Sequence, residues 1–335
     1  MKKALIIALI CFIVGAVLIG VAWVFLNPAD KNTVKDSVYE YDIDELPTQI
    51  NIITINSRVE LRSIEGDEWK VACMDKEKLY HTVEFVDGVL TVKQIDTRQW
   101  YENIGILNNF QNLSVIVYLP AQAYESLSIH STSGSIKVQE GFTFSNASLQ
   151  NTSGSIFCIS RVAGALNVKN TSGSIKVSGN VGSDLIAKNT SGSIFVDGKV
   201  EGDMTVKNTS GSIHVIGGVG GALEVACGSG RIEIANATPT RATVKNTSGG
   251  IYLENVVCKE SCTVENTSGG IELQRCDAMT FDVTTVSGGI RASILTAKSF
   301  DCRSTSGSVK VPNDGNGGTF KARSTSGSIK ITIVE

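Results

Sequence analysis

Aspartates at equal positions in successive repeats are the residues of this 335-residue sequence that best fit a catalytic role. Asp184 and Asp203 both stand eight residues before the glycine of a Ser-Gly motif, and Asp282 and Asp301 both stand six before it. If the repeats stack as strands, each pair lies about 5 Å apart, near the carboxylate separation of a retaining glycosidase. Solvated surface acids are the simpler interpretation, because no repeat carries an insertion of more than one residue that would exclude water. A carbohydrate-active enzyme is therefore the alternative hypothesis, and a non-enzymatic protein is the main one.

The other reactive residues form no recognisable site. The three histidines, His81, His130 and His214, lie in no metal-like or triad-like cluster of the sequence. Cys258 and Cys262 lack the second ligand pair that a zinc site needs, and we expect the eight cysteines to be mainly small buried residues. The calcium-binding nonapeptide and the lysine of a phosphate loop are also missing. The sequence thus predicts no catalytic residue, no metal site and no cofactor.

A repeat of 19 or 20 residues makes up most of the chain, so it must position most of the candidate functional side chains. Its marks are the glycines Gly134, Gly154, Gly173, Gly192, Gly211, Gly230, Gly249, Gly269, Gly288, Gly307 and Gly327. Apolar residues recur two and four positions after each glycine, and again seven and five positions before it, with variable residues between them. Such period-two alternation indicates strands, and a fixed period of this length indicates stacked coils. We predict an all-β parallel β-solenoid of about eleven coils, roughly 50 Å long.

A polar column stands three residues before the glycines. Six of its eleven members are asparagines: Asn151, Asn170, Asn189, Asn208, Asn246 and Asn266. By parity with the apolar columns they point inward at a corner, where stacked amides can donate and accept along the stack as a structural ladder. The alternative is that asparagine simply favours the turn backbone. The glycines themselves are expected to adopt a positive φ.

One outward column is the candidate recognition surface. It lies between the two apolar columns that follow each glycine, and it contains Phe157, Phe195, His214 and Tyr252. Exposed rings among charged residues could contact sugars or a partner protein, whereas the simpler interpretation is scattered surface residues. A second outward column is basic and reads as a solvated ladder that discourages lateral strand pairing. It contains Lys169, Lys188, Lys207 and Lys245.

Residues 4–26 form an apolar run without a charge, long enough for a helix to cross a bilayer. Lys2 and Lys3 precede it, which predicts a cytoplasmic stub at residues 1–3 and an extracytoplasmic remainder. A cleaved signal peptide is the alternative, but its apolar region is normally shorter. We therefore predict a single-pass protein of the cell membrane.

The rest of the chain divides into a linker at residues 27–48, an irregular β-rich cap at 49–126 and the repeat solenoid at 127–335. The Asp87-Gly88 pair between apolar runs predicts a hairpin within the cap. A solenoid needs such a cap to cover its open apolar end. The last repeat shows no cap, so we expect self-association or a partner at the C-terminal coil.

The stretch Val115-Ile-Val-Tyr-Leu-Pro120, then Leu127-Ser-Ile129 and the repeated Ser-Gly-x-Ile-x-Val motif, carries a family resemblance. From about Ile50 onward the chain resembles the bacterial putative-adhesin family of β-strand-repeat proteins, a domain of unknown function. The resemblance implies a parallel β-solenoid, often exported or membrane-anchored, and supplies no catalytic residues. A net charge of −3 gives no basic footprint for nucleic acid. The resulting hypothesis is a membrane-anchored solenoid for adhesion, binding or envelope scaffolding, with a glycan or an envelope protein as partner.

Overall fold

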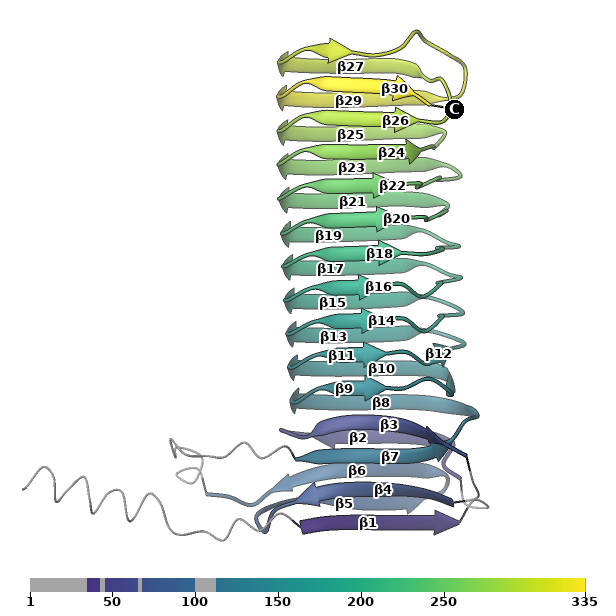
Figure 1. Ribbon diagram of the computed structural model, residues 1–335, viewed down its shortest axis with the longest axis vertical. Helices are drawn as coiled ribbons and strands as arrows, with labels where there is room; N and C mark the ends of the chain where they lie inside the picture. Colours follow the sequence, from purple (N-terminus) through teal and green to yellow (C-terminus); the bar gives the residue numbers. More distant parts are fainter. Residues whose placement is uncertain (1–34, 43–45, 66–67, 100–112, 335) are drawn as a thin grey trace, which may run out of the picture.

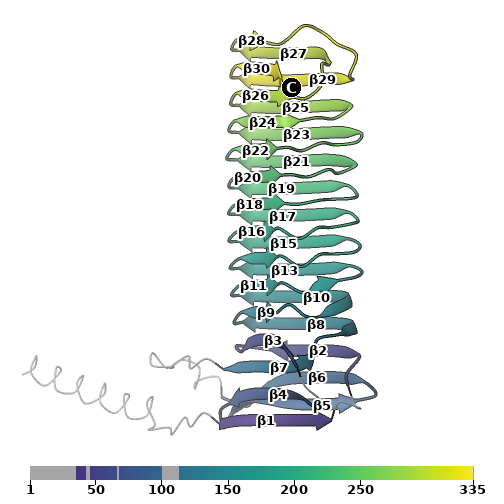
Figure 2. The same ribbon diagram turned by 45° about the vertical axis from the view of Figure 1, so that its right-hand side comes forward.

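The structure, a computed structural model, describes residues 35–42, 46–65, 68–99 and 113–334. Every regular element in these residues is a β-strand, and two sheets run face to face along one rod (Figure 1). The turned view in Figure 2 shows tight corners along one edge of the rod and longer loops along the other. The predicted all-β parallel solenoid is confirmed.

The first sheet, sheet A, has fifteen strands. In spatial order they are β1 (Lys35–Asp42), β4 (Glu68–Asp75), β7 (Ser114–Pro120), β3 (Arg58–Ile64), β9 (Ile136–Val138), β11 (Ile156–Cys158), β14 (Ile175–Val177), β16 (Ile194–Val196), β18 (Ile213–Ile216), β20 (Ile232–Ala235), β22 (Ile251–Glu254), β24 (Ile271–Cys276), β26 (Ile290–Ile294), β30 (Ile329–Ile333) and β28 (Val309–Lys310).

The second sheet, sheet B, holds the longer strands that precede each corner. In spatial order they are β27 (Ser299–Ser306), β29 (Thr319–Ser326), β25 (Thr280–Ser287), β23 (Ser261–Ser268), β21 (Arg241–Ser248), β19 (Leu223–Ser229), β17 (Met204–Ser210), β15 (Leu185–Ser191), β13 (Leu166–Ser172), β10 (Thr143–Ser153), β8 (Ala123–Ser133), β2 (Gln49–Thr54), β6 (Val89–Asp96) and β5 (Leu79–Val86). The short β12 (Arg161–Val162) pairs with β10.

The repeat glycine turns each coil from sheet B to sheet A. All eleven repeat glycines have a positive φ, between 107° and 157°, as expected. A Cβ on any of them would lie 2.1–2.4 Å from a carbonyl oxygen of the neighbouring corner. The apolar columns meet between the sheets, where Ile156, Val168 and Ile175 have no exposed surface. Their burial supplies the core, at about 1.5–3 kcal/mol for each large apolar side chain.

The region before the first repeat continues both sheets. β2 pairs in parallel with β8, and β3 pairs in parallel with β9. Beyond them, β6 pairs in parallel with β2, and β7 pairs in parallel with β3. Antiparallel strands follow: β5 pairs with β6, β4 pairs with β7, and β1 pairs with β4. The predicted Asp87-Gly88 hairpin is confirmed as the turn between β5 and β6.

The predicted N-terminal segments are only partly within the described residues. Lys35–Asp42, part of the predicted linker, forms β1 and pairs with β4. The predicted anchor at residues 4–26 lies outside the described part of the chain. In the part that is described, no helix has the length and apolarity needed to span a membrane.

The last repeat of the sequence is not the last coil of the rod. β29 lies between β25 and β27, and β30 lies between β26 and β28, so the preceding repeat is outermost (Figure 1). Ile329 in the inserted coil is fully buried, whereas Val309 in the outermost coil is 39% exposed. The open edge that we expected at the C-terminal coil is therefore found at β27 and β28.

A buried lysine contacts the loop between β28 and β29, through which the chain passes from the outermost coil to the inserted coil. Lys298 is 2% exposed, and its Nζ lies 2.7 Å from Asp277 Oδ1. The same ammonium donates to the carbonyl oxygen of Gly317, just before β29. Arg323 of β29 also pairs with Asp301 of β27. A buried charge is costly unless it is paired, so these contacts are expected to persist. Lys298 thereby connects the loop before β29 to Asp277.

The six ladder asparagines are buried, but their amides do not bond to one another. Each Nδ2 donates to the carbonyl oxygen of the corner glycine one coil earlier, at 2.7–2.8 Å. Where the repeat lacks asparagine, Cys227, Thr285 and Ser324 make the same contact through sulfur or oxygen. The repeated feature is thus a side-chain donor to the glycine carbonyl.

The coil order predicts a ranking of two core substitutions. Ile329→Ala should lower the free energy of unfolding by about 2–5 kcal/mol, because it leaves a cavity between two coils. Val309→Ala should cost less than about 1 kcal/mol, because Val309 is already 39% exposed and has no coil on its outer side. Urea denaturation of both variants measures the difference, and the reverse ranking would contradict the insertion.

The corner contact predicts the effect of removing one ladder side chain. Asn189→Ala leaves the buried Gly173 carbonyl without its donor and should lower the free energy of unfolding by about 1–3 kcal/mol. Asn189→Thr should lose less, since Thr285 bonds to Gly269 in the same way. Equal losses in chemical denaturation would show that the hydrogen bond does not matter.

Candidate functional site

The predicted recognition column lies on the outer face of sheet A. Strand pairing puts these side chains in consecutive levels: Phe157, Lys176, Phe195, His214, Glu233, Tyr252 and Glu272. Their apolar neighbours on either side point into the core, so this column must point outward. Phe157 and Phe195 are 36% and 39% exposed.

Side-chain contacts join part of this column into a continuous surface. The Phe195 and His214 rings stack with centroids 4.8 Å apart, and His214 Nδ1 lies 2.7 Å from Glu233 Oε2. Arg231 Nε lies 2.7 Å from Glu233 Oε1, and its guanidinium sits 5.8 Å from the Tyr252 ring centroid. We call these five residues the ring face.

The ring face includes three of the four predicted recognition residues. Phe157 is separate, because Lys176 lies between it and Phe195 and pairs instead with Asp197 at 3.7 Å. Sequence reasoning missed Arg231, which follows the corner glycine where other repeats have serine or glycine. That departure from the repeat was the available signal.

Sheet A is hollowed beside Tyr252. A trough of about 790 Å³ lies over β22, β24, β26, β30 and β28. Its charged and aromatic lining is Arg231, Tyr252, Glu272, Arg291, Lys310 and Lys330. The ring face therefore continues into a basic surface.

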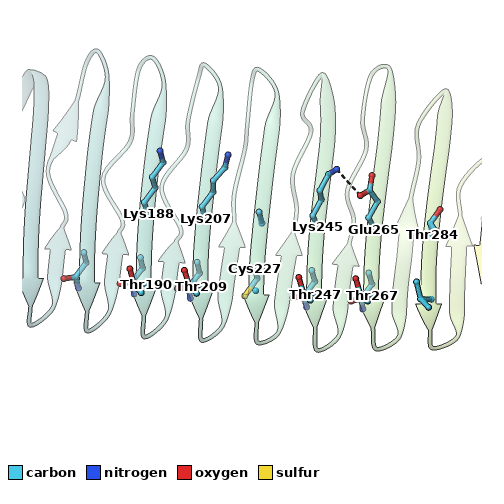
Figure 3. A pocket seen from close by; sticks show the side chains of 18 of the residues that line it. Lys188, Thr190, Lys207, Thr209, Cys227, Lys245, Thr247, Glu265, Thr267 and Thr284 are labelled. Atoms are coloured by element: carbon cyan, nitrogen blue, oxygen red, sulfur yellow. Dashed lines mark ion pairs between the residues drawn. The ribbon is translucent and has the colours of Figure 1, made fainter.

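The outer face of sheet B carries the predicted lysine column. Figure 3 shows Lys188, Lys207 and Lys245 in one row and Thr190, Thr209, Thr247 and Thr267 in a second. These rows border an open groove of about 990 Å³. Lys207 pairs with Glu224 at 2.7 Å and Lys245 with Glu265 at 3.0 Å, while Ala226 interrupts the row. The groove is polar and partly neutralised by its own ion pairs.

The aspartates of the two predicted pairs differ in their surroundings. Asp184 Oδ1 accepts the Asp203 amide at 2.8 Å, and Asp203 Oδ1 accepts the Ala222 amide at 2.8 Å. These carboxylates therefore bind the backbone of the following coil. The expected stacking of Asp282 on Asp301 is wrong, because the inserted coil places Lys321 between them.

The expectation that no histidine joins a triad-like cluster is also wrong. Ser57 Oγ lies 2.9 Å from His81 Nε2, and His81 Nδ1 lies 2.6 Å from Asp75 Oδ1. The three residues are 0%, 2% and 5% exposed. Two strands and two turns separate Ser57 from His81 in the chain, so the sequence gave no sign of this contact.

Burial gives this cluster a structural role. A catalytic serine must touch its substrate, and Ser57 has no exposed surface. Burial lowers the pKa of His81 despite the raising influence of Asp75, so the neutral ring accepts from Ser57 and donates to Asp75. Gln94 Oε1 accepts the amides of Ile55 and Asn56 nearby. Together these bonds hold the turn at residues 55–57 that leads into β3.

The cysteines and possible metal ligands are the other reactive side chains of the described residues. Their seven cysteines are unpaired, and all but Cys302 are buried. Burial raises the pKa of the Cys158 and Cys276 thiols to about 12, which keeps them protonated. No group of three or more histidine, cysteine or acidic side chains in that part of the chain could hold a metal ion.

The chain belongs to the Toastrack DUF4097 family, whose model matches residues 48–217 and 220–335. This match confirms the resemblance drawn from the repeat motif. No curated protein matches the chain.

Solved structures resemble the chain over most of its length. A putative cell adhesion protein from Clostridium sporogenes is 8% identical, with 90% of this chain and 100% of that chain covered and a TM-score of 0.22. A putative lipid binding protein from Parabacteroides distasonis is 14% identical, with coverages of 89% and 97% and a TM-score of 0.37. A putative adhesin from the same species is 14% identical, with coverages of 90% and 98% and a TM-score of 0.35.

The neutral buried His81 predicts a pH dependence of stability. Its pKa is lower in the folded state, so the unfolded chain binds more protons and stability is lost as pH falls below about 6.5. The stability gap between the wild type and His81→Gln should therefore narrow between pH 7.5 and pH 5.5. Urea denaturation across this range measures the gap. The matched control is the exposed His130, whose His130→Gln variant should track the wild type; a constant gap for His81→Gln would contradict the prediction.

Proposed function

We propose that the protein is a membrane-anchored, extracytoplasmic β-solenoid that binds a glycan or an envelope protein without catalysing a reaction. The ring face is the observation that carries this proposal. Two outward rings, an imidazole, a carboxylate and a guanidinium make one connected surface on a rigid sheet. Tyrosine and arginine are enriched among the few residues that carry most of the binding energy of protein interfaces.

The ring face is suited to binding because its side chains are already ordered. Stacking on His214 limits the rotamers of Phe195, and Arg231 is held by Glu233 against Tyr252. Immobilising a free side chain on binding costs about 0.5–1.5 kcal/mol. Contacts made before binding reduce that cost and favour recognition of a flat ligand surface.

The proposed anchor is residues 4–26, with the N-terminus in the cytoplasm and the solenoid outside the cell membrane. Its support is the uncharged apolar run preceded by Lys2 and Lys3. In this arrangement the rod projects the ring face away from the bilayer. An enzymatic alternative has less support, since the candidate carboxylates Asp184 and Asp203 are engaged by backbone amides.

The proposal is tested by retention of defined ligands on the full-length protein in lipid nanodiscs. Purified peptidoglycan and an array of bacterial glycans serve as probes. The double variant Phe195→Ser, Tyr252→Ser should lose at least about tenfold in retention, equivalent to 1.4 kcal/mol, while its unfolding midpoint stays near that of the wild type.

The matched control is Ile186→Ser. Ile186 is 38% exposed on the outer face of sheet B, so its replacement removes a similar exposed apolar group away from the ring face. It should bind as the wild type does. Full retention by the ring-face double variant would reject this surface as the binding site.

A further inference from the structure

The trough beside Tyr252 runs over three successive coils that lack a side chain at one position. The position directly after the corner glycine is serine in seven repeats: Ser135, Ser155, Ser174, Ser193, Ser212, Ser308 and Ser328. It is Arg231 in one repeat and glycine in the remaining three, namely Gly250, Gly270 and Gly289. These three glycines line the trough, together with Ser328 and Ser308 of the next two coils, and Arg231 lines it from the coil before Gly250; we call the three glycines its floor.

The backbone does not require glycine at the first two of these positions. Neither Gly250 nor Gly270 has a positive φ, unlike the corner glycines that precede them. A Cβ added at Gly250 would meet nothing nearer than 3.9 Å, and one at Gly270 nothing nearer than 3.6 Å. The fold therefore accepts serine there, and the bare floor needs a reason other than folding.

The far part of the trough carries three adjacent positive side chains, and Glu272 lies beside the first of them, Arg291. Strand pairing places Lys330 directly beside both Arg291 and Lys310. None of the three forms an ion pair within the described residues. Like charges opposite each other on neighbouring strands are destabilising, so this run costs stability until an anion binds.

The rest of the same column avoids such contacts. From Phe157 to Glu272, every charged side chain has only rings or an opposite charge as its neighbours in the column. Lys169, Lys188 and Lys207 on sheet B are also adjacent, but Lys207 pairs with Glu224 and no ring borders them. The combination of free cations, a ring and a bare floor occurs in the trough.

Each part of the trough matches a part of one ligand class. The Tyr252 ring, steadied by Arg231, offers an amphipathic wall at one end of the glycine floor. Guanidinium and ammonium groups bind carboxylates through charge-assisted hydrogen bonds. Three cations in successive strands, about 4.8 Å apart along the rod, fit a chain that carries an acid on each unit.

We propose that the trough binds a linear acidic polysaccharide with carboxylate-bearing sugars. One sugar ring lies on the floor of Gly250 and Gly270 against Tyr252, and the carboxylates of this and the following sugars pair with Arg291, Lys330 and Lys310. This inference rests on the proposed binding function of the same face and names the class of glycan. The chain of the ligand runs along the rod axis, across β22 to β28.

The experiment titrates labelled oligogalacturonate into the full-length protein in nanodiscs, with neutral dextran as the comparison probe. The double variant Gly250→Ser, Gly270→Ser gives both coils the residue that most other coils carry and fills the floor. It should weaken oligogalacturonate binding at least about tenfold, equivalent to 1.4 kcal/mol, without changing the unfolding midpoint.

A second double variant, Arg291→Gln, Lys330→Gln, should weaken oligogalacturonate binding and flatten the dependence of this binding on salt concentration. Ser193→Ala, at the same position of a coil outside the trough, is the matched control and should bind as the wild type does.

Three outcomes would overturn the inference. Unchanged binding by the Gly250→Ser, Gly270→Ser variant would show that the floor is not used. Inorganic polyphosphate bound as tightly, with the same sensitivity to both double variants, would show a surface that takes any polyanion. Retention of neutral glycans alone, still abolished by Phe195→Ser, Tyr252→Ser, would reject the acidic ligand while leaving the proposed binding function intact.

Discussion

The stacking of one glycine corner on the next is the constraint on which the rod depends. Each corner comes so close to the carbonyl of its neighbour that a Cβ would lie 2.1–2.4 Å from that oxygen. The same carbonyl accepts a hydrogen bond from the amide, hydroxyl or thiol that follows one coil later. Because both contacts are made at one point, they fix the register of the two sheets together and leave the outward columns free to vary.

The sequence predicts the structural features that recur from coil to coil. The apolar columns, the positive φ of the corners and the inward asparagines all follow from counting outward from Gly173 or any other corner. Such counting fixes the phase of a residue within its coil, since inward and outward positions alternate along a strand. It also separates the ring face from the core, and so most of the candidate site could be located before the structure.

What the sequence does not predict is the order of the coils and the contacts between distant segments. The repeat spacing shows which residues of a coil point inward or outward, but it does not show which coil stacks on which. The spacing therefore did not reveal that Lys321 lies between Asp282 and Asp301. The Lys298–Asp277 pair and the Ser57–His81–Asp75 cluster depend on tertiary packing in the same way. Arg231 was visible as a break in the repeat, but its contacts with Glu233 and Tyr252 were not.

The inserted final coil has a mechanical consequence. In a simple stack the terminal coil has one neighbour, and tension on its end peels it away one hydrogen bond at a time. Here the strands β29 and β30 each have a neighbour on both sides, and Lys298 fastens the loop that leads into them. Removal of the C-terminal strand β30 therefore requires its separation from two neighbouring strands instead of one. A rod built in this way resists unravelling from the end farthest from its cap.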